Sequence, residues 1–556
     1  MFAREPMTHF STHDVVNQPC PLKNYNVYNQ DQALVEGLHR EGAASFDQSA
    51  QTLGESAGSE DVIRLGFLAN DYPPELKSYD RYGQRIDEIE FHPAYHELMR
   101  LGFGAGIQSI AWNNHGPGGH VAHTALIYLM AQVDAGVCCP IAMSYAAVPS
   151  LKRQPDVAAE WLPKILSQQY DPRCIPADEK TGCTIGMAMT EKQGGSDVRA
   201  NTTKATPIAS GGPGKAYHLT GHKWFYSAPM SDVFLTLAKT NAGLSCFLVP
   251  RWLPEGHRNC FYIQRIKHKL GNRSNASAEM EYHNTWAQLI GSESEGVRTI
   301  IDMVHHTRLD ASASGAGLMR AALVQAIHHA VHRSAFGKRL IKQPGMKNVL
   351  ADLALESEAA TTLFLRVART FDDSGANESE RLLCRFGTAL AKYWINKRAP
   401  AFVAEALECH GGAGYIEESI MPRLYREAPL NGIWEGSGTV VCLDILRTLY
   451  KERDAIDAYI TEIEQARGCD KRLDRYIESV KQLLLSFSFS ECDARRITEQ
   501  LALCLQAALL VRHAPTNTAD AFCASRLGAN WGYTFGTLPR GLPFSRLIER
   551  AWAIAD

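Results

Sequence analysis

The spacing of apolar residues changes twice along this chain, and these changes limit the folds that it can adopt. Apolar residues recur every three or four positions up to about residue 170 and again from 296 to about 450, which is typical of amphipathic helices. Between them, Val233–Lys239 and Leu244–Val249 are short β-type runs joined by a turn, and Phe261–Ile266 and Ala278–Tyr282 indicate two more strands. The sequence therefore predicts a mostly α protein with a β middle domain.

These changes of period divide the 556 residues into four parts, since the chain is too long for one compact core. We expect an N-terminal arm and helical domain at 1–182, a β domain at 183–290, a helical bundle at 291–450 and an extension of two or three helices at 451–556. The first residues, to about 56, are polar with scattered aromatics and one helical piece around Gln32–His39, so we expect an arm that packs against another part of the protein.

The composition describes an ordinary globular protein and argues against several classes. The net charge of -3 argues against broad electrostatic attraction to nucleic acid but leaves room for a local basic patch. The 14 cysteines include no C-x-x-C, which argues against a zinc ribbon or a thioredoxin-type site and fits reduced thiols in a cytosol. Since neither a secretory signal nor a membrane-spanning apolar run is visible, we expect a soluble, cytoplasmic protein.

The stretch Gly432–Thr439 places a carboxylate, Glu435, after a tryptophan and before a glycine-flanked hydroxyl. Glycine lets a backbone approach a ligand that a Cβ would hold away, so Glu435 could act as a general base toward a bound acidic C–H group. The alternative is an ordinary turn before a helix, with Ser437 as the N-cap. These eight residues alone leave both interpretations open.

Other segments have the composition of ligand loops, and each has a plain structural alternative. Met189–Asp197 can offer backbone N–H groups to a ring or a phosphate, or form a polar turn. Gly221–Ser227 reads equally well as an aromatic-rich strand that fills a core. The remaining segments are the basic loop Lys269–Asn275, the pair Thr307-Arg308, the run Arg333–Gly337 and the break His410–Tyr415, for which solvated arginines and an ordinary helix break are the alternatives.

In order and spacing, these segments together resemble the acyl-CoA dehydrogenase family over roughly residues 90 to 450. The family pattern T-E-x-x-x-G-S-D is matched at Thr190, Glu191, Gly195, Ser196 and Asp197, and G-x-K-x-[W/F]-x-[T/S] at Gly221, Lys223, Phe225 and Ser227. K-[L/M]-G-x-R-x-S is matched in part at Lys269–Arg273, and T-R, R-x-x-F-G, G-G-x-G-Y and [Y/W]-E-G-[T/S] are found at Thr307-Arg308, Arg333–Gly337, Gly411–Tyr415 and Trp434–Ser437. The Lys192–Gly194 variant, the N-terminal arm and the C-terminal extension are most similar to the AidB-type alkylation-response flavoproteins.

The resemblance implies an N-terminal helical domain, a β-barrel-like middle domain and a C-terminal four-helix bundle, followed here by the helical extension. It also implies a homotetramer. FAD would be held non-covalently between the middle and C-terminal domains, with its adenylate end reaching a neighbouring subunit. The implied partners are an acyl-CoA-like substrate and an electron acceptor, whose identities the sequence leaves open.

In such a site Glu435 takes the α-proton of an acyl thioester while hydride leaves the β-carbon for the flavin, and Arg308 orders the catalytic turn. The thioester oxygen is met by the Glu435 backbone N–H and a ribityl hydroxyl of FAD, because charge that builds there needs fixed donors. The implied cofactor-binding residues are Met189, Thr190, Gly195, Ser196, Phe225, Ser227, Arg333, Phe336, Gly412, Ser437 and Thr439, of which Arg333 and Phe336 meet the adenylate across the subunit interface.

Two positions depart from the family pattern. Pro344 stands seven residues after the glycine of R-x-x-F-G, and Glu408 stands three residues before G-G-x-G-Y, where the family usually has glutamine at both places. A carboxylate near a pyrophosphate repels it unless the side chain turns away or pairs with an arginine. We therefore expect the cross-subunit contacts to FAD to differ from the family pattern.

AidB-type proteins are understood to bind double-stranded DNA through their C-terminal region, so basic residues of the extension are candidates for that role. They are Lys471, Arg472, Arg475, Arg495, Arg496, Arg546 and Arg550. Basic and acidic residues are about balanced there, so a docked helical domain with ordinary surface arginines is the alternative.

Three functions stay open on the sequence. The first is an FAD-containing AidB-type protein of the DNA alkylation response that retains an acyl-CoA dehydrogenase site. The second is a metabolic short- or branched-chain acyl-CoA dehydrogenase without a DNA role. The third is a flavin-stabilised DNA-binding protein without physiological dehydrogenation, against which the presence of Glu435 argues mildly.

Overall fold

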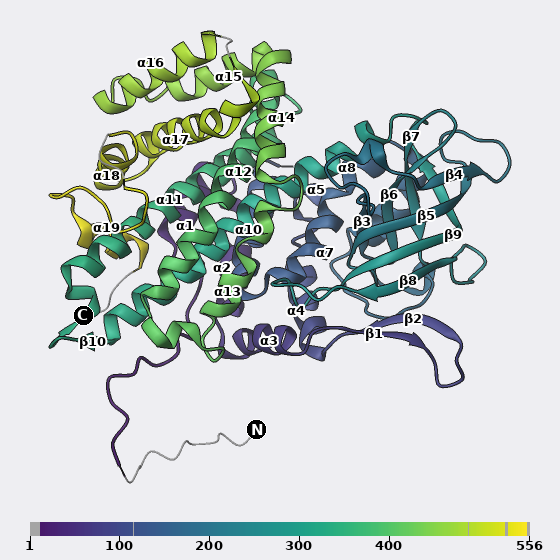
Figure 1. The fold of residues 1–556 in the computed structure, drawn as a ribbon, viewed down its shortest axis with the longest axis horizontal. Coiled ribbons are helices and arrows are strands. Elements are labelled where there is room, and N and C mark those ends of the chain that lie inside the picture. The colour runs from purple at the N-terminus through teal and green to yellow at the C-terminus, as the bar shows by residue number, and fades with distance from the viewer. Residues whose placement is uncertain (1–11, 115, 487–488, 529–531, 553–556) are drawn as a thin grey trace.

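The computed structural model describes residues 12–114, 116–486, 489–528 and 532–552. In Figure 1 the β domain lies at one end of the molecule, the long helices of the bundle cross its middle, and the last helices lie at the other end. This arrangement confirms the predicted mostly α fold with a β middle domain. No helix in the described ranges is long and apolar enough to span a membrane.

The N-terminal region is largely a layer of helices, and the helical piece expected around Gln32–His39 is present as the first of them. Helix α1 (Gln32–Arg40) is capped by Asp31, whose carboxylate accepts from the Leu34 N–H. The helix packs on α6 and α11, and Leu34 and Leu38 are among its buried residues. Its few apolar residues fall on one helix face, which is why a polar stretch can still dock. The other helices here are α2 (Asp47–Ala57), α3 (Glu60–Asp71), α4 (Pro93–Gly104), α5 (Ile110–Asn113), α6 (Gly119–Val133), α7 (Ala135–Ala146), α8 (Val148–Leu151) and α9 (Pro155–Ile165).

A hairpin of β1 (Glu75–Tyr79) and β2 (Arg85–Glu90) interrupts these helices and was not predicted. It extends toward the β domain (Figure 1), where the Arg85 guanidinium donates to the Ile263 carbonyl at 2.8 Å. The Asp80 carboxylate holds its turn by accepting from two backbone N–H groups. Most of its residues are polar and only partly buried, so no apolar alternation marks it.

The middle domain is a seven-stranded sheet that closes on itself. The strand order is β3-β6-β4-β5-β9-β7, and β8 pairs with β9. A further pairing of β6 with β7 closes the sheet. This closure confirms the β-barrel-like domain, and all four predicted strands are present. The strands are β3 (Ile185–Ala188), β4 (Lys204–Pro207), β5 (Ala216–Ser227), β6 (Val233–Lys239), β7 (Leu244–Pro250), β8 (Phe261–Ile266) and β9 (Ser277–Ile290).

Three long helices form the centre of the bundle: α10 (Gly296–His332), α11 (Pro344–Asp373) and α12 (Glu378–Glu408), with α14 (Gly438–Lys451) packed on α12 as the fourth. The apolar period expected from 296 to about 450 gives α11 an apolar stripe, which is buried at Leu350, Leu353, Ala360, Leu363 and Val367. A short hairpin of β10 (Ser334–Ala335) and β11 (Lys338–Arg339) links α10 to α11, and α13 (Met421–Glu427) precedes the turn that carries Glu435.

Within its described residues the extension has five helices, so the expectation of two or three was wrong. Pro515 separates one long apolar stretch into α17 (Ala494–His513) and α18 (Thr516–Arg526), because proline cannot continue the first helix. The others are α15 (Arg453–Glu464), α16 (Lys471–Ser486) and α19 (Phe544–Ala551). Helix α17 packs on α11, α12 and α14, so the extension shares the core of the bundle.

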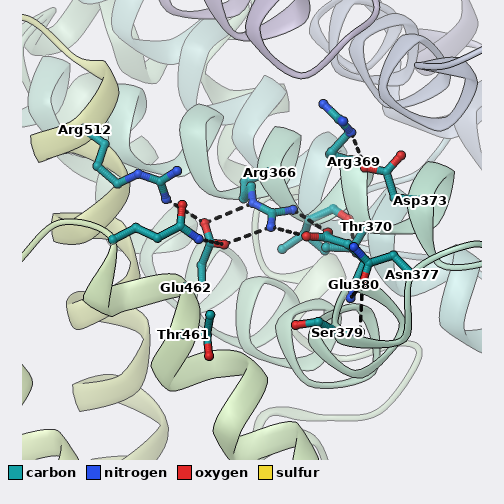
Figure 2. Close-up of polar contacts among 12 residues, drawn as sticks. Arg366, Arg369, Thr370, Asp373, Asn377, Ser379, Glu380, Thr461, Glu462 and Arg512 are labelled. Carbon is teal, nitrogen blue, oxygen red and sulfur yellow. Dashed lines mark hydrogen bonds and ion pairs between the residues drawn. The ribbon is translucent and has the colours of Figure 1, made fainter.

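A buried ion network ties the extension to the bundle (Figure 2). The Arg366 guanidinium on α11 pairs with Glu380 on α12 at 2.8 Å and with Glu462 on α15 at 2.9 Å. Arg512 on α17 pairs with the same Glu462 at 2.9 Å. Residues from four helices therefore meet at two shared and largely buried charges, those of Arg366 and Glu462.

Candidate active site

A cavity lies where the N-terminal helices, the β domain and the bundle meet. The predicted residues Ser227 and Glu435 both line it, although they lie far apart in the sequence. Its walls come from α7, from the β domain, from one face of α10 and from the turn before α14. They consist of Ala135, Cys138, Cys139, Ala142, Met143, Met187, Ser227, Asn272, Thr307, Asp310, Ala311, Ser314, Leu318, Glu427, Leu430, Asn431, Trp434 and Glu435.

The backbone of the Glu435 turn is strained and held from two sides. Glu435 has φ +56 and Gly436 has φ +99, and a left-handed non-glycine residue is uncommon outside functional sites. The Arg308 Nε donates to the Glu435 carbonyl at 2.9 Å, and the Lys392 ammonium donates to the Gly436 carbonyl. The neighbouring Trp434 is oriented by its indole N–H, which donates to the Asn431 Oδ1 at 2.8 Å.

The Glu435 carboxylate is poised to accept a proton. Its Oε2 is buried and has no hydrogen-bond partner among the described residues. Burial raises the pKa of Glu435, while the Thr307 hydroxyl and the Arg308 and Lys392 cations oppose that rise. Burial also lowers the pKa of Lys392 to about 7. A base in this setting has more affinity for a proton than an exposed glutamate.

Arg308 is itself positioned by an anion that it shares with a second arginine. Its Nη1 lies 2.8 Å from Asp444 on α14, and Arg385 on α12 lies 2.8 Å from the same carboxylate. Burial works against ionisation of Asp444, but the guanidiniums of Arg385 and Arg308 hold its pKa at about 2. Three helices thus converge behind the Glu435 turn.

The loop Met189–Asp197 leaves β3 and is fixed by a buried ion pair. Both side chains of the pair, Glu191 and Lys223, are fully buried and lie 2.9 Å apart. The Glu191 carboxylate also accepts from the backbone N–H of Thr202 at 2.6 Å. Burial favours the neutral acid, yet Lys223 and these N–H donors hold the pKa of Glu191 at about 2. The pair therefore sets the shape of the predicted flavin loop.

Several of the predicted cofactor-binding residues lie along this loop and on β5. The Trp224 N–H donates to the Thr190 carbonyl at 2.8 Å, which places Thr190 beside the strand that carries Phe225 and Ser227. Phe225 is 47% exposed, and the Lys267 ammonium lies 4.6 Å from its ring centre.

Gly195, in the loop itself, faces the Thr190 side chain, from which an added Cβ would lie 3.2 Å away. Met189 packs at the edge of the core near the cavity, while Ser196 is exposed in the loop.

Helix α14 begins one residue after Ser437, directly after the Glu435 turn. Ser437 occupies the N-cap position, but its side chain makes no capping hydrogen bond, so the plain capping alternative does not describe it. Arg495 of the extension donates to the Thr439 hydroxyl at 2.8 Å. Arg495, a predicted DNA residue, thus contacts Thr439, a predicted cofactor-binding residue.

Arg333, Phe336 and Gly412 do not line the cavity in the single chain. Phe336 sits at the tip of the β10–β11 hairpin with φ +52 and is 98% exposed, and Arg333 donates to the Asn17 carbonyl at 2.5 Å. Gly412 is exposed in a turn after α12. These three residues are therefore brought to the surface and not to Glu435.

The two departures from the family pattern lie near that surface. Pro344 is the first residue of α11, and the preceding Gln343 donates its side-chain N–H to the Ala335 carbonyl of the hairpin at 3.0 Å. Glu408 ends α12 with an exposed side chain, and no ion pair joins it to another described residue. The arginine partner considered for Glu408 is thus not found within the described part of one chain.

The predicted DNA residues divide into two groups. Arg472 pairs with Asp470 and Asp520, and Arg550 pairs with Glu36 and Glu358, so the charges of both are neutralised within the protein. The others have exposed side chains, although Arg496 and Arg546 pair with neighbouring carboxylates; these residues are Lys471, Arg475, Arg495, Arg496 and Arg546.

Several residues of the site were not predicted. Lys392 and Asp444 act on the turn from distant helices, and Asp310 and Glu427 add buried carboxylates to the cavity wall. A lysine or aspartate within a long helix carries no local mark of such a role. The ion pair of Glu191 and Lys223 could have been found, because both residues stand in the matched motifs.

Comparison with known proteins agrees with this architecture. Residues 17–172 match the adaptive response protein AidB N-terminal domain, 186–285 the acyl-CoA dehydrogenase middle domain and 294–450 the acyl-CoA dehydrogenase C-terminal domain. The putative acyl-CoA dehydrogenase AidB of Escherichia coli is 44% identical over 94% of this chain and 96% of its own length.

Solved structures show the same fold. A Caenorhabditis elegans protein, ACDH-11, determined in complex with C11-CoA, is 26% identical and superimposes with a TM-score of 0.84 over 98% of this chain and 94% of its own. An acyl-CoA dehydrogenase from Bacillus anthracis complexed with FAD, at 15% identity and a TM-score of 0.67, covers 91% of this chain and 90% of its own and shares the fold. This chain belongs to the acyl-CoA dehydrogenase family and, within it, to the AidB-like members.

Proposed function

We propose that this protein is an FAD-dependent acyl-CoA dehydrogenase in which Glu435 is the base that takes the α-proton of the thioester. The observation that carries the proposal is the state of that carboxylate. It faces the cavity, its Oε2 is buried without a partner among the described residues, and burial raises its pKa. Such a carboxylate is stabilised when it receives a proton.

The residues around the cavity fit FAD. Ser227 and Trp434 line the same cavity as Glu435, and Thr190 is hydrogen-bonded to the strand that carries Ser227. The first N–H groups of α14 have no side-chain cap, and such groups favour a phosphate. When bound, FAD supplies the acceptor for the hydride of the β-carbon.

The contribution of this chain to the reaction is alignment and proton transfer. Arg308 and Lys392 hold the carbonyls of Glu435 and Gly436, so the turn does not reorganise when the side chain takes a proton. Apolar side chains such as Met143, Met187 and Leu318 line the rest of the cavity and exclude water from the acidic C–H group. The Glu435 N–H is the proposed donor to the thioester oxygen.

Anaerobic titration with a panel of acyl-CoA thioesters of increasing chain length tests this proposal. We expect the protein to purify yellow, with flavin near one per chain, and at least one thioester to bleach the flavin absorbance. A protein that contains flavin but is bleached by none of the thioesters would contradict the proposed dehydrogenation. Such a result would favour the flavin-stabilised DNA-binding alternative.

We also propose a homotetramer in which the β10–β11 hairpin meets FAD of a neighbouring subunit. Phe336 and Tyr415 are 98% and 81% exposed, and large aromatics so exposed are typical of interfaces. Light scattering should give four chains per particle, and Phe336→Asp should lower both that number and the flavin content. A wild-type monomer with full flavin content would contradict the arrangement.

We further propose that the protein acts in the DNA alkylation response and that its extension binds double-stranded DNA. It is supported by the likeness to AidB and by the exposed Lys471, Arg475 and Arg495, none of which has an ion-pair partner among the described residues. Binding should weaken as salt rises, since phosphate contacts release counterions. Triple substitution of these three residues by glutamine should reduce it, whereas the same change at Arg472 should have a smaller effect. Absence of binding at low salt would favour a metabolic acyl-CoA dehydrogenase.

All fourteen cysteines are unpaired thiols, which supports the proposed reducing, cytoplasmic location.

A further inference from the structure

A second carboxylate on the cavity wall, Asp310 of α10, has no role in the proposed proton transfer. The residue is 2% exposed, and it lines the same cavity as Glu435. Its Oδ1 lies 2.7 Å from His123 Nε2 on α6, whereas its Oδ2 has no hydrogen-bond partner among the described residues. A buried acceptor that is left unpaired in a mostly apolar cavity is costly, so it points to a missing donor.

The hydrogen bonds of His123 determine what Oδ2 can accept. His123 Nδ1 lies 2.7 Å from the Ile107 carbonyl, which only accepts, so Nδ1 must carry a proton. The short contact between Nε2 and Oδ1 then needs one further proton, held by either partner. In both cases Oδ1 is occupied by His123 and Oδ2 has only lone pairs to offer.

The same accounting fixes the charge of the pair. One shared proton gives either aspartate with imidazolium or aspartic acid with imidazole, and the net charge of the pair is zero in both cases. The pair is sealed from solvent on its far side, where the Tyr145 ring stacks on His123 with ring centres 3.4 Å apart. A neutral donor can therefore bind Oδ2 without bringing an uncompensated charge into the cavity, whereas an ammonium group cannot.

The position of Asp310 relates it to the reacting carbons. Thr307, whose hydroxyl acts on the Glu435 carboxylate, stands three residues earlier on the same helix face. Three residues of helix rise about 4.5 Å, which is the length of about three or four chain bonds. If Glu435 meets the α-carbon and the acyl chain runs along α10 toward Asp310, a hydroxyl oxygen on the fourth or fifth carbon, three or four bonds from the α-carbon, reaches the depth of Oδ2.

We propose that Asp310 and His123 form a subsite for a hydroxyl group on the acyl chain, so that the favoured substrates are acyl-CoA thioesters with a hydroxyl near the fourth or fifth carbon. The subsite rests on the proposed acyl-CoA dehydrogenase function, which it refines. The hydroxyl donates to Oδ2 and satisfies the one acceptor that the protein leaves open. An unsubstituted chain of equal length leaves it unpaired.

Matched thioester pairs test the subsite in the FAD-loaded protein. The pairs are 4-hydroxybutanoyl-CoA with pentanoyl-CoA and 5-hydroxypentanoyl-CoA with hexanoyl-CoA, since each replaces a terminal methyl by a hydroxyl. For at least one pair we expect the hydroxyl form to have kcat/KM for flavin reduction about 10- to 100-fold higher. 5-Aminopentanoyl-CoA, which carries an ammonium group, should not share the advantage.

Variants assign the preference to Asp310. Asp310→Asn should keep the preference for a hydroxyl, because the amide N–H satisfies His123 Nε2 and the amide oxygen still faces the cavity. Asp310→Leu should remove the preference or invert it. Arg496→Gln, a substitution at an exposed residue that does not line the cavity, should leave the ratio within each pair unchanged. Flavin content and melting temperature show whether each variant is folded.

Binding separates this proposal from the proposed reaction. Calorimetric titration of Glu435→Gln with the same pairs measures the preference even if no thioester bleaches the flavin. Tighter binding of the hydroxyl form supports the subsite, whatever the outcome for dehydrogenation. Equal binding and equal kcat/KM within every pair would overturn the subsite and leave the dehydrogenase function intact. If neither form of any pair bound, the subsite would also be overturned.

Discussion

The Arg308 guanidinium on α10 binds the main chain of Glu435, the proposed base: its Nε lies 2.9 Å from the Glu435 carbonyl oxygen. The same guanidinium lies 2.8 Å from Asp444, so an anion holds Arg308 while Arg308 holds the turn. Glu435 needs this support because its backbone is left-handed, a conformation that costs a non-glycine residue about 1 to 3 kcal/mol.

Loss of the Arg308 contact should therefore slow the reaction more than it weakens binding. We expect Arg308→Gln to lower the rate of flavin reduction by an acyl-CoA about 10- to 100-fold, because small displacements of a catalytic group are expensive. Arg385→Gln is the matched control, since it removes the other partner of Asp444 without touching the turn. Equal rates for the two variants in single-turnover experiments would show that Arg308 acts only through Asp444.

The pH dependence of flavin reduction should report the raised pKa of Glu435. The base works when deprotonated, so the rate should fall as the pH drops through that pKa. Because burial moves the pKa upward, the midpoint of the acidic limb should lie above the value of about 4.3 for a free glutamate. A rate that stays constant down to pH 4 would be inconsistent with this assignment.

The ion pair of Glu191 and Lys223 should be essential for the flavin loop. Lys223→Met leaves a fully buried carboxylate without its cation, which typically costs about 3 to 5 kcal/mol in the free energy of unfolding. We expect a lower melting temperature and reduced flavin content. The double variant with Glu191→Gln removes the unpaired charge and should recover part of the stability; if it is as unstable as Lys223→Met, the charge is not the cause.

The network in Figure 2 should couple the extension to the bundle. Arg366→Met removes the cation that joins Glu380 and Glu462, so the free energy of unfolding should fall by about 3 to 5 kcal/mol. Arg496→Gln breaks a largely exposed pair with Asp493 and should change it by less than about 1 kcal/mol. Denaturant titrations of both variants test the difference, and equal losses would argue against the coupling.

Much of the fold could be predicted because the period of apolar residues is a local property. The four strands from Val233 to Tyr282 and the apolar stripe of α11 all form as expected. The β1–β2 hairpin was missed because polar residues occupy both of its faces, and Pro515 was not recognised as the boundary between two helices. The docking of the extension depends on contacts between distant segments, which the period does not report.

The site residues also divide into those that the sequence could predict and those that it could not. Glu435, Arg308 and Ser227 could be named in advance because they stand in short motifs, and the structure places each of them on the cavity or its supporting turn. His123 and Asp310 lie 187 positions apart, in helices whose sequences give no sign that the two side chains meet. Such pairs become visible only when α6 and α10 pack together.

The most direct test of the account is the rate of anaerobic flavin reduction by a reactive acyl-CoA in Glu435→Gln. This substitution keeps the size of the side chain and removes its ability to take the α-proton. We predict a rate lower by about 10²- to 10⁴-fold, with flavin content and thioester affinity close to those of the wild type. Reduction of the flavin by Glu435→Gln at the wild-type rate would contradict the account, because another group would then have to be the base.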